Sequence, residues 1–265
     1  MIRPVLPLLL GLAFLGAPVR VRADEPVFCA ERPGQTTPPC VTAPGHLMLE
    51  SGLAAWQRQQ DAESRTDSWS FGATQLRLGL GSSVEAQLGW QMLGSSRTTD
   101  LAGHPLASAS RVGDVTLGLL YGLAGANGPV AVQFFASLPA GRPPISAGDW
   151  GAGARLPVAL ALPHGWQLGV TPEIDAAVNQ SARGRHLAFG GAVGLGHAIS
   201  NAVSFGMDLS MMRDADPAGA STRAIATASL AWQANARTQF DFGGGAGLNH
   251  DSLDKQFYFG VARSF

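Results

Sequence analysis

Residues 84–92 read VEAQLGWQM, and their apolar and polar side chains alternate without a break. Successive side chains of a β-strand point to opposite faces, so this stretch predicts a strand with one apolar and one polar wall. A similar alternation occurs in DVTLGLLY at residues 114–121 and in VSFGMDLSM at residues 203–211. Soluble β-sandwiches show the same pattern, so alternation by itself leaves two fold classes open.

The spacing of these stretches distinguishes the two classes. We predict twelve strands near residues 46–56, 68–80, 84–93, 112–122, 130–138, 150–162, 166–178, 186–199, 203–212, 222–233, 238–248 and 256–265. Most reach the ~9–11 residues that a tilted membrane strand needs. Tight turns alternate with longer polar links, which we expect near residues 57–67, 93–111, 139–149, 179–185, 213–221 and 249–255. The sequence therefore predicts an all-β fold: a single transmembrane antiparallel β-barrel of about 12 strands, with short periplasmic turns and longer extracellular loops.

Composition supports this class and excludes others. Gly accounts for 34 of the 265 residues, charged residues for 14%, and the formal net charge is −1. Lys255 is the only lysine. A disordered chain would carry more charge, and a nucleic-acid binder would need a surplus of basic residues. Tryptophans fall near the ends of predicted strands, as in the aromatic girdles of a barrel, at Trp56, Trp69, Trp90, Trp150, Trp166 and Trp232.

The first 23 residues resemble an export signal. Arg3 precedes a short apolar run at residues 5–16, and small residues before Ala23 fit a cleavage site. We therefore predict a signal peptide at residues 1–23, a periplasmic N-terminal segment at 24–45 and a barrel at 46–265. The expected location is the outer membrane of a Gram-negative bacterium, with both mature termini periplasmic.

Two cysteines, Cys29 and Cys40, follow the predicted cleavage site. In an exported protein such a pair is expected to form a disulfide, which would add about 2–3 kcal/mol of stability. A metal site would need more His or Cys ligands than this segment has.

The last strand ends on an aromatic residue. Phe257, Phe259, Val261 and Phe265 share one face, and this pattern resembles the signal read by the barrel insertion machinery. Arg263 occupies a position where that signal usually has an apolar or aromatic residue. Outer-membrane lipid and the insertion machinery are thus the expected partners, and nucleic acid is not.

Several short motifs resemble one outer-membrane family, labelled as the meta-pathway of phenol degradation. They are Arg32-Pro33-Gly34, Thr36-Thr37-Pro38-Pro39, Pro44-Gly45-His46, Leu49-Glu50, residues 113–119 and residues 137–141. The resemblance runs from about residue 32 to the C-terminus. It implies an outer-membrane barrel that passes hydrophobic or aromatic compounds.

The polar faces of the predicted strands define a candidate lumen. We expect its charged residues to be Glu50, Arg77, Glu85, Asp114, Arg155, Glu173, Asp175, Asp208 and Asp241. Seven of these are acidic, which would disfavour anions. They either satisfy a polar interior or form a filter for solutes. A barrel of this size is narrow, and residues 24–45 could close it.

The tight turn centred on His164 predicts a specific contact in the lumen. Residues equally far from the turn face each other, so Arg155 opposes Glu173 with both side chains pointing inward. The same reasoning places Arg77 diagonal to Glu85.

No catalytic constellation emerges from the sequence. His186, Ser68 and Ser70 all fall on the predicted inner face, and no serine, histidine and carboxylate combine at the spacing of a triad. The glycine run at residues 243–245 lacks the strand-to-helix context of a phosphate loop. We expect no catalytic residue, metal site or cofactor.

Two functions remain. One is passive passage of small hydrophobic or aromatic compounds across the outer membrane. The alternative is a structural or surface-binding barrel with a closed lumen, and an outer-membrane lipid hydrolase is a weaker third.

Overall fold

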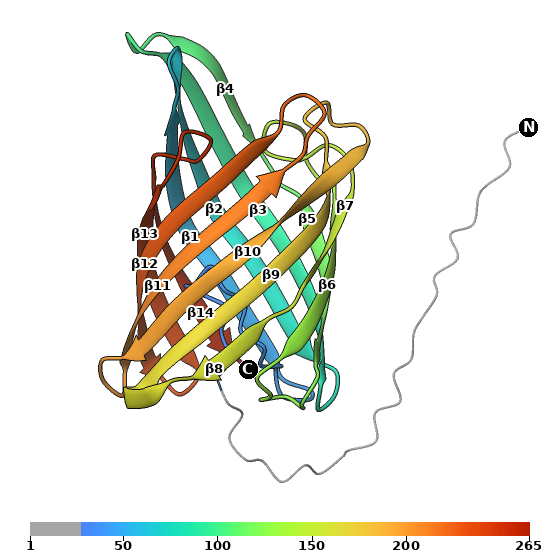
Figure 1. Cartoon of the computed structure of the whole chain (residues 1–265), viewed down its shortest axis with the longest axis vertical. Coiled ribbons are helices and arrows are strands. Elements are labelled where there is room, and N and C mark those ends of the chain that lie inside the picture. The colour runs from blue at the N-terminus through green and yellow to red at the C-terminus, as the bar shows by residue number, and fades with distance from the viewer. Residues whose placement is uncertain (1–27) are drawn as a thin grey trace, which may run out of the picture.

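The computed structural model describes residues 28–265 (Figure 1). The predicted signal peptide at residues 1–23 lies outside this range. A single 3-10 turn, Pro163–Gly165, is the helical element of the described part. Within it, no helix is long and apolar enough to cross a membrane.

One closed antiparallel sheet forms the molecule. Its strands are β1 (Leu47–Gln60), β2 (Ser64–Gly79), β3 (Val84–Asp100), β4 (Pro105–Arg111), β5 (Val115–Gly122), β6 (Ala131–Leu138), β7 (Gly151–Arg155), β8 (Val158–Ala161), β9 (Trp166–Val178), β10 (Arg185–Ala198), β11 (Val203–Asp214), β12 (Ser221–Asn235), β13 (Thr238–Gly247) and β14 (Lys255–Ser264). The first strand pairs with the last, with Met48 opposite Ser264, and this closes the ring. Twelve strands close the ring, β8 pairs with β9 beyond the end of β7, and β4 pairs with β3 off the ring, so the predicted fold class is confirmed.

Two of the expected long links are strands instead. β1 and β2 continue to a connection of residues 61–63, where a link over 57–67 was predicted. β3 and β4 form a hairpin over most of residues 93–111, which projects beyond the rim (Figure 1). Polar residues with good strand propensity extend the ladder there, as in the hydrogen bond between Thr66 and Thr98.

The predicted strand at residues 150–162 is interrupted. Pro157 has no N–H to donate to the ladder, so β7 ends at Arg155 and β8 begins at Val158. Its carbonyl still accepts a hydrogen bond from Ala131 N at 2.9 Å. Both short strands pair with β9, and together they fill the space between β6 and β9.

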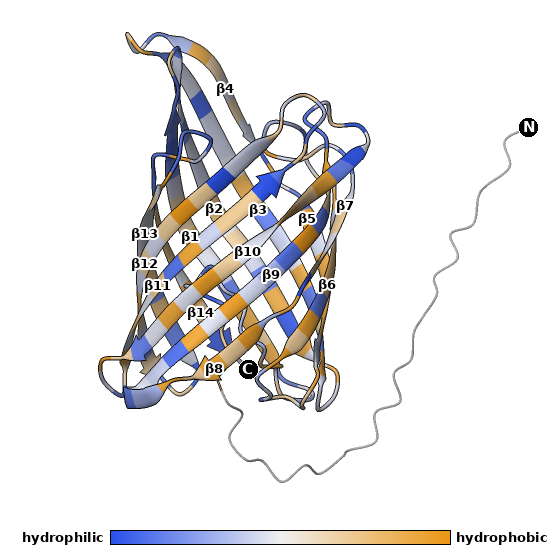
Figure 2. Cartoon of the chain, in the orientation of Figure 1, coloured by the Kyte–Doolittle hydropathy of each residue, from blue (hydrophilic) through white to orange (hydrophobic). Residues whose placement is uncertain are grey.

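Many large apolar side chains along the strands are exposed. Figure 2 shows hydrophobic and hydrophilic residues alternating along the strand ribbons. Trp56 contacts both Trp69 and Phe257, with ring centroids 6.2 Å and 6.0 Å apart, on the loop-side part of the wall. Trp232 packs on Phe240 near the opposite rim. Aromatic rings thus gather towards both ends of the strands, as they do where a barrel meets two membrane interfaces.

Candidate channel lumen and its N-terminal plug

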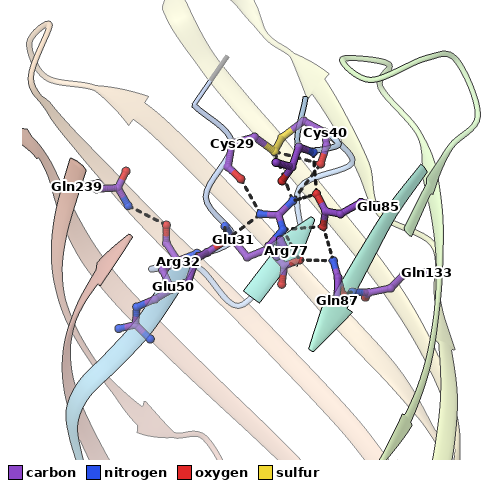
Figure 3. Close-up of polar contacts among 11 residues, drawn as sticks. Cys29, Glu31, Arg32, Cys40, Glu50, Arg77, Glu85, Gln87, Gln133 and Gln239 are labelled. Atoms are coloured by element: carbon purple, nitrogen blue, oxygen red, sulfur yellow. Dashed lines mark hydrogen bonds and ion pairs between the residues drawn. A yellow bond between two sulfur atoms is a disulfide. The ribbon is translucent and has the colours of Figure 1, made fainter. Parts of the chain in front are cut away.

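The described residues that precede β1 lie inside the barrel. We call residues 28–45 the plug. Its C-terminal part is fixed near the short turns, where Val41 N donates to Ala126 O at 2.8 Å and Gly45 N donates to Gly79 O at 2.9 Å. From this end it fills the centre of the lumen, so the interior is occupied by the protein's own chain (Figure 3).

Arg77 on β2 is the hub of the first anchor. Its buried guanidinium donates to Glu85 and Glu50, at 2.7 Å and 2.9 Å. It also donates to the plug carbonyls of Cys29 (2.6 Å) and Cys40 (3.2 Å), and a second bond reaches Glu85 (Figure 3). All five guanidinium N–H groups are therefore used, which is the condition for burying such a charge.

The predicted disulfide is present in the plug. Cys29 and Cys40 are bonded, and they close the loop whose two end carbonyls accept from Arg77. The next plug residues also bind this cluster, because Thr42 N donates to Glu85 at 2.7 Å and Glu31 N donates to Glu50 at 3.0 Å. The cross-link thus ties together both sides of the loop that covers Arg77.

A second anchor holds the plug to the last strands. Arg32 forms a bidentate pair with the buried carboxylate of Asp241 on β13, at 3.0 Å and 2.7 Å. Gln239 donates to the carbonyl of Arg32 at 3.0 Å, and the Tyr258 hydroxyl donates to that of Pro33 at 3.0 Å. A Cβ atom on Gly260 would overlap the Arg32 guanidinium, so this glycine makes room for the pair.

A third set of contacts lies on β9 and β11. Thr37 N donates to the Thr171 hydroxyl at 3.0 Å. Asp208 accepts from the Thr36 hydroxyl at 3.5 Å and from that of Thr227 at 3.5 Å. The plug is therefore held at several points around the ring.

Each charged residue predicted for the lumen has a definite place. Five of them contact the plug: Glu50, Arg77, Glu85, Asp208 and Asp241. Arg155 donates to Glu173 at 2.8 Å, in the cross-strand register that the turn at His164 predicts. Asp175 follows on the same strand, and Asp114 accepts from the Ala147 N–H of the β6–β7 loop at 2.9 Å.

Open space remains on the loop side of the plug. A cavity of about 440 Å³, which we call the loop-side chamber, lies between β2, β3, β5, β6 and β7. Its wall includes the side chains Gln87, Gln91, Asp114, Gln133, Phe135 and Arg155, together with Glu31 of the plug. A further cavity of about 370 Å³ also touches Glu31 and Arg155. These two residues therefore lie where the two spaces meet.

A chain of amides fixes the polarity of the loop-side chamber. Gln87 donates to Glu31 and Glu85, at 3.1 Å and 2.7 Å, so its carbonyl oxygen must face the other way. That oxygen accepts from Gln133 Nε2 at 2.6 Å. Gln133 Oε1 and Asp114 Oδ1 have no hydrogen-bond partner within residues 28–265. Both oxygens are buried, although their side chains line the chamber.

Phe135 brings an aromatic ring to this polar wall. It lies on β6 between the lipid-facing Phe134 and Ala136, so its side chain points inward. The Arg155 guanidinium sits 4.6 Å from its centroid. Gly118 is paired with Phe135 across the ladder, and Gly153 could not accommodate a Cβ beside the ring.

Sequence reasoning missed the plug's own side chains and its amide partners. Arg32 appeared only as part of a family motif, and Gln87 and Gln133 were not among the predicted lumen residues. Their roles depend on contacts between segments 46 to 209 residues apart, which no local pattern reveals.

The residues considered for hydrolysis do not combine. In the described chain His186 contacts Asn179, Asp214 and Asp216, and no serine is among its polar partners. Of the aromatic residues of the predicted assembly signal, Phe257 and Phe259 lie on β14 and Phe265 directly follows it, and all three are exposed.

A plugged twelve-strand barrel has clear relatives. The model of the family described as "Putative MetA-pathway of phenol degradation" matches residues 30–265. The chain belongs to this family. The resemblance inferred from short motifs is thereby confirmed, and the phenol-degradation family match begins inside the plug rather than at β1.

Solved structures share the fold. The COG4313 outer membrane channel from Pseudomonas putida F1 has a TM-score of 0.64 at 13% identity, covering 85% of this chain and 97% of that one. The β domain of the Bordetella autotransporter BrkA has a TM-score of 0.53 at 15% identity, with coverages of 84% and 100%. The NanC porin has a TM-score of 0.51 at 8% identity, covering 82% of this chain and 98% of that one. None of the curated proteins matches this sequence significantly. The fold is that of an outer-membrane β-barrel.

Proposed function

We propose that this protein is an outer-membrane channel for passive passage of small aromatic compounds that carry polar groups. In this proposal the plug is the barrier, and a solute crosses the lumen when the plug shifts. The observation that carries it is the coexistence of a plug in the barrel centre with a polar chamber of about 440 Å³ beside it. The turn side of the barrel, where Phe265 ends the chain, would then face the periplasm.

The chamber wall supports the choice of solute. Phe135 offers a ring face for stacking, and aromatic pairs are worth about 0.5–1.5 kcal/mol beyond their buried area. Gln133 Oε1 and Asp114 Oδ1 are buried and lack partners among the described residues, so a solute that donates O–H or N–H bonds would satisfy them once these side chains turn toward the chamber. A purely apolar solute would leave these acceptors unpaired, which disfavours it.

A closed structural barrel is the competing function. The anchors of the plug favour it, since every N–H of the Arg77 guanidinium is satisfied in the plugged state. The two proposals differ in one respect: a closed barrel transmits no solute under any condition.

Uptake into proteoliposomes separates these functions. The refolded mature protein is compared with empty liposomes, using labelled tyrosine and phenylalanine, which differ by one hydroxyl and cross lipid slowly. We expect protein-dependent uptake of both, with tyrosine favoured. Uptake equal to that of empty liposomes would support the closed barrel and refute passage.

Neighbouring phenylalanines on β6 provide a matched pair of variants. Phe135→Leu removes the ring from the chamber, while Phe134→Leu changes a side chain on the outer face that is 56% exposed. Leucine, which has no ring, serves as the reference solute. We expect Phe135→Leu, but not Phe134→Leu, to reduce uptake of tyrosine and phenylalanine relative to uptake of leucine. Equal effects of the two substitutions would exclude the loop-side chamber from the route.

A further inference from the structure

Three side chains converge at the loop end of the barrel, away from the plug. His186 lies at the start of β10, Asp214 ends β11 and Asp216 follows in the next loop. The neighbouring Leu187 is exposed on the outer face, so His186 points inward, and its side chain is only 5% exposed. This cluster has no part in the proposed passage of solutes.

The hydrogen bonds around His186 fix which ring nitrogen carries the proton. Asn179 Nδ2 donates to Arg183 O at 2.8 Å, so Asn179 Oδ1 must face the imidazole. This oxygen lies 2.9 Å from His186 Nδ1 and accepts its N–H. The neutral ring then has a lone pair on Nε2. An oriented ring of this kind, with one N–H given to a carbonyl oxygen, is typical of histidines that bind metals.

The other ring nitrogen faces a carboxylate. His186 Nε2 lies 2.6 Å from Asp214 Oδ1, but the contact does not have the direction of a hydrogen bond. Nε2 is buried and has no hydrogen-bond partner in the described part of the chain. In the neutral ring, the Nε2 lone pair and a carboxylate oxygen face each other in a site largely shielded from water, where a bound cation would relieve their repulsion.

Asp216 completes the group. The ligand atoms of the three residues all lie within 4.8 Å of one another. The amides of Ala218 and Gln180 donate to the Asp216 carboxylate at 2.7 Å and 2.6 Å. These two hydrogen bonds hold the carboxylate in place, with its Oδ2 3.5 Å from His186 Nδ1.

Nearby positive charges leave the centre of the cluster free. The Arg223 guanidinium approaches the other oxygen of Asp214, at 3.8 Å. Arg185 is engaged elsewhere, by Asp149 at 2.9 Å and the Trp150 carbonyl. Neither cation lies between His186 Nε2 and Asp214 Oδ1.

We propose that His186, Asp214 and Asp216 bind a divalent transition-metal ion of the Zn²⁺ type. One imidazole nitrogen and two carboxylates suit such an ion, whereas Ca²⁺ and Mg²⁺ prefer oxygen ligands alone. The bound ion ties the start of β10 to the end of β11 and the β11–β12 loop at the mouth of the barrel. This inference does not depend on the proposed transport function.

Zinc titration of the folded full-length mature protein, without a histidine tag, tests the site. We expect about one equivalent of Zn²⁺ to bind by calorimetry, and a tenfold excess of Ca²⁺ to leave that binding in place. Zn²⁺ should also slow hydrogen exchange at the amides of Gln180 and Ala218, because it fixes the carboxylate that they bond.

Variants locate the ion. His186→Gln and Asp214→Asn should each abolish binding, and retained heat-modifiable migration on gels would show that the barrel is folded. His250→Gln is the matched control: His250 also sits 2.9 Å from an aspartate in a nearby loop, but it is 91% exposed. We expect that variant to bind Zn²⁺ as the wild type does. Absence of binding in the wild type, loss in His250→Gln or retention in His186→Gln would each overturn the site.

Discussion

Arg32 and Asp241 lie 209 residues apart in the sequence and form a bidentate ion pair inside the barrel. The carboxylate is fully buried, and the guanidinium comes from the plug. This pair therefore links the segment before the first strand to the thirteenth strand, β13. The position of the plug therefore depends on a contact that a single substitution can remove.

Loss of this pair is expected to loosen the plug. Arg32→Gln leaves the charge of Asp241 buried without its partner, and breaking a buried pair in this way costs about 3–5 kcal/mol. We predict more frequent openings in single-channel recordings than in the wild type. Arg58→Gln is the control, because the Arg58–Asp67 pair at 2.8 Å does not involve the plug. A silent Arg32→Gln variant would contradict this role.

A methyl group at Gly260 is expected to act through steric overlap. The Cβ of Gly260→Ala would occupy the place of the Arg32 guanidinium, and overpacking of this kind costs about 1–3 kcal/mol. We predict a folded barrel with raised conductance. Gly81→Ala, whose added Cβ would meet open space, should conduct like the wild type. Identical traces for the two variants would show that Arg32 adapts without moving the plug.

Reduction of the disulfide should release the loop over Arg77. Opening the Cys29–Cys40 link removes about 2–3 kcal/mol of cross-link stabilisation from the plug. We predict that a thiol reductant added to the bilayer chamber increases conductance of the wild type. The double variant Cys29→Ser with Cys40→Ser should show the higher conductance without reductant, and adding the reductant should not change it. A wild-type trace insensitive to complete reduction would mean that the Arg77 contacts hold the plug unaided.

Glu173 is expected to control ion selectivity. Its carboxylate is bonded to Arg155 at 2.8 Å, and Arg155 lies where two lumen cavities meet. Glu173→Gln keeps the side chain's shape but removes the negative charge that balances the positive charge of Arg155. We predict a reversal potential shifted towards anions. An unchanged reversal potential would assign the pair to filling a polar interior rather than filtering solutes.

Sequence patterns predict the wall of this barrel well because each strand has a simple two-residue period. The register of β7 and β9 followed from one turn, which correctly placed Arg155 opposite Glu173. Extension of β1 and β2 beyond the apolar part was missed, since polar residues above the membrane level show no alternation. The break at Pro157 was likewise hidden inside a stretch that looked continuous.

The interior was less predictable than the wall. An inward position of Asp241 could be inferred from strand parity, but its partner Arg32 could not, because the plug has no periodic structure to set its path. The position of Asp216 at the rim could not be inferred either, because it lies in a loop. The residues that it contacts are brought close by the closed ring and not by their positions in the sequence.

The plug's partners on β13 and β14 have a consequence for how the protein matures. Residues 28–45 emerge before every strand during synthesis, yet Asp241, Gln239 and Tyr258, which hold the plug, belong to the last strands to appear. The plug can make all of these contacts only when the C-terminal hairpin has joined β1. With the plug as the proposed barrier, completion of the wall and closure of the lumen coincide, and a nascent barrel without its final strands cannot hold the plug fully in place.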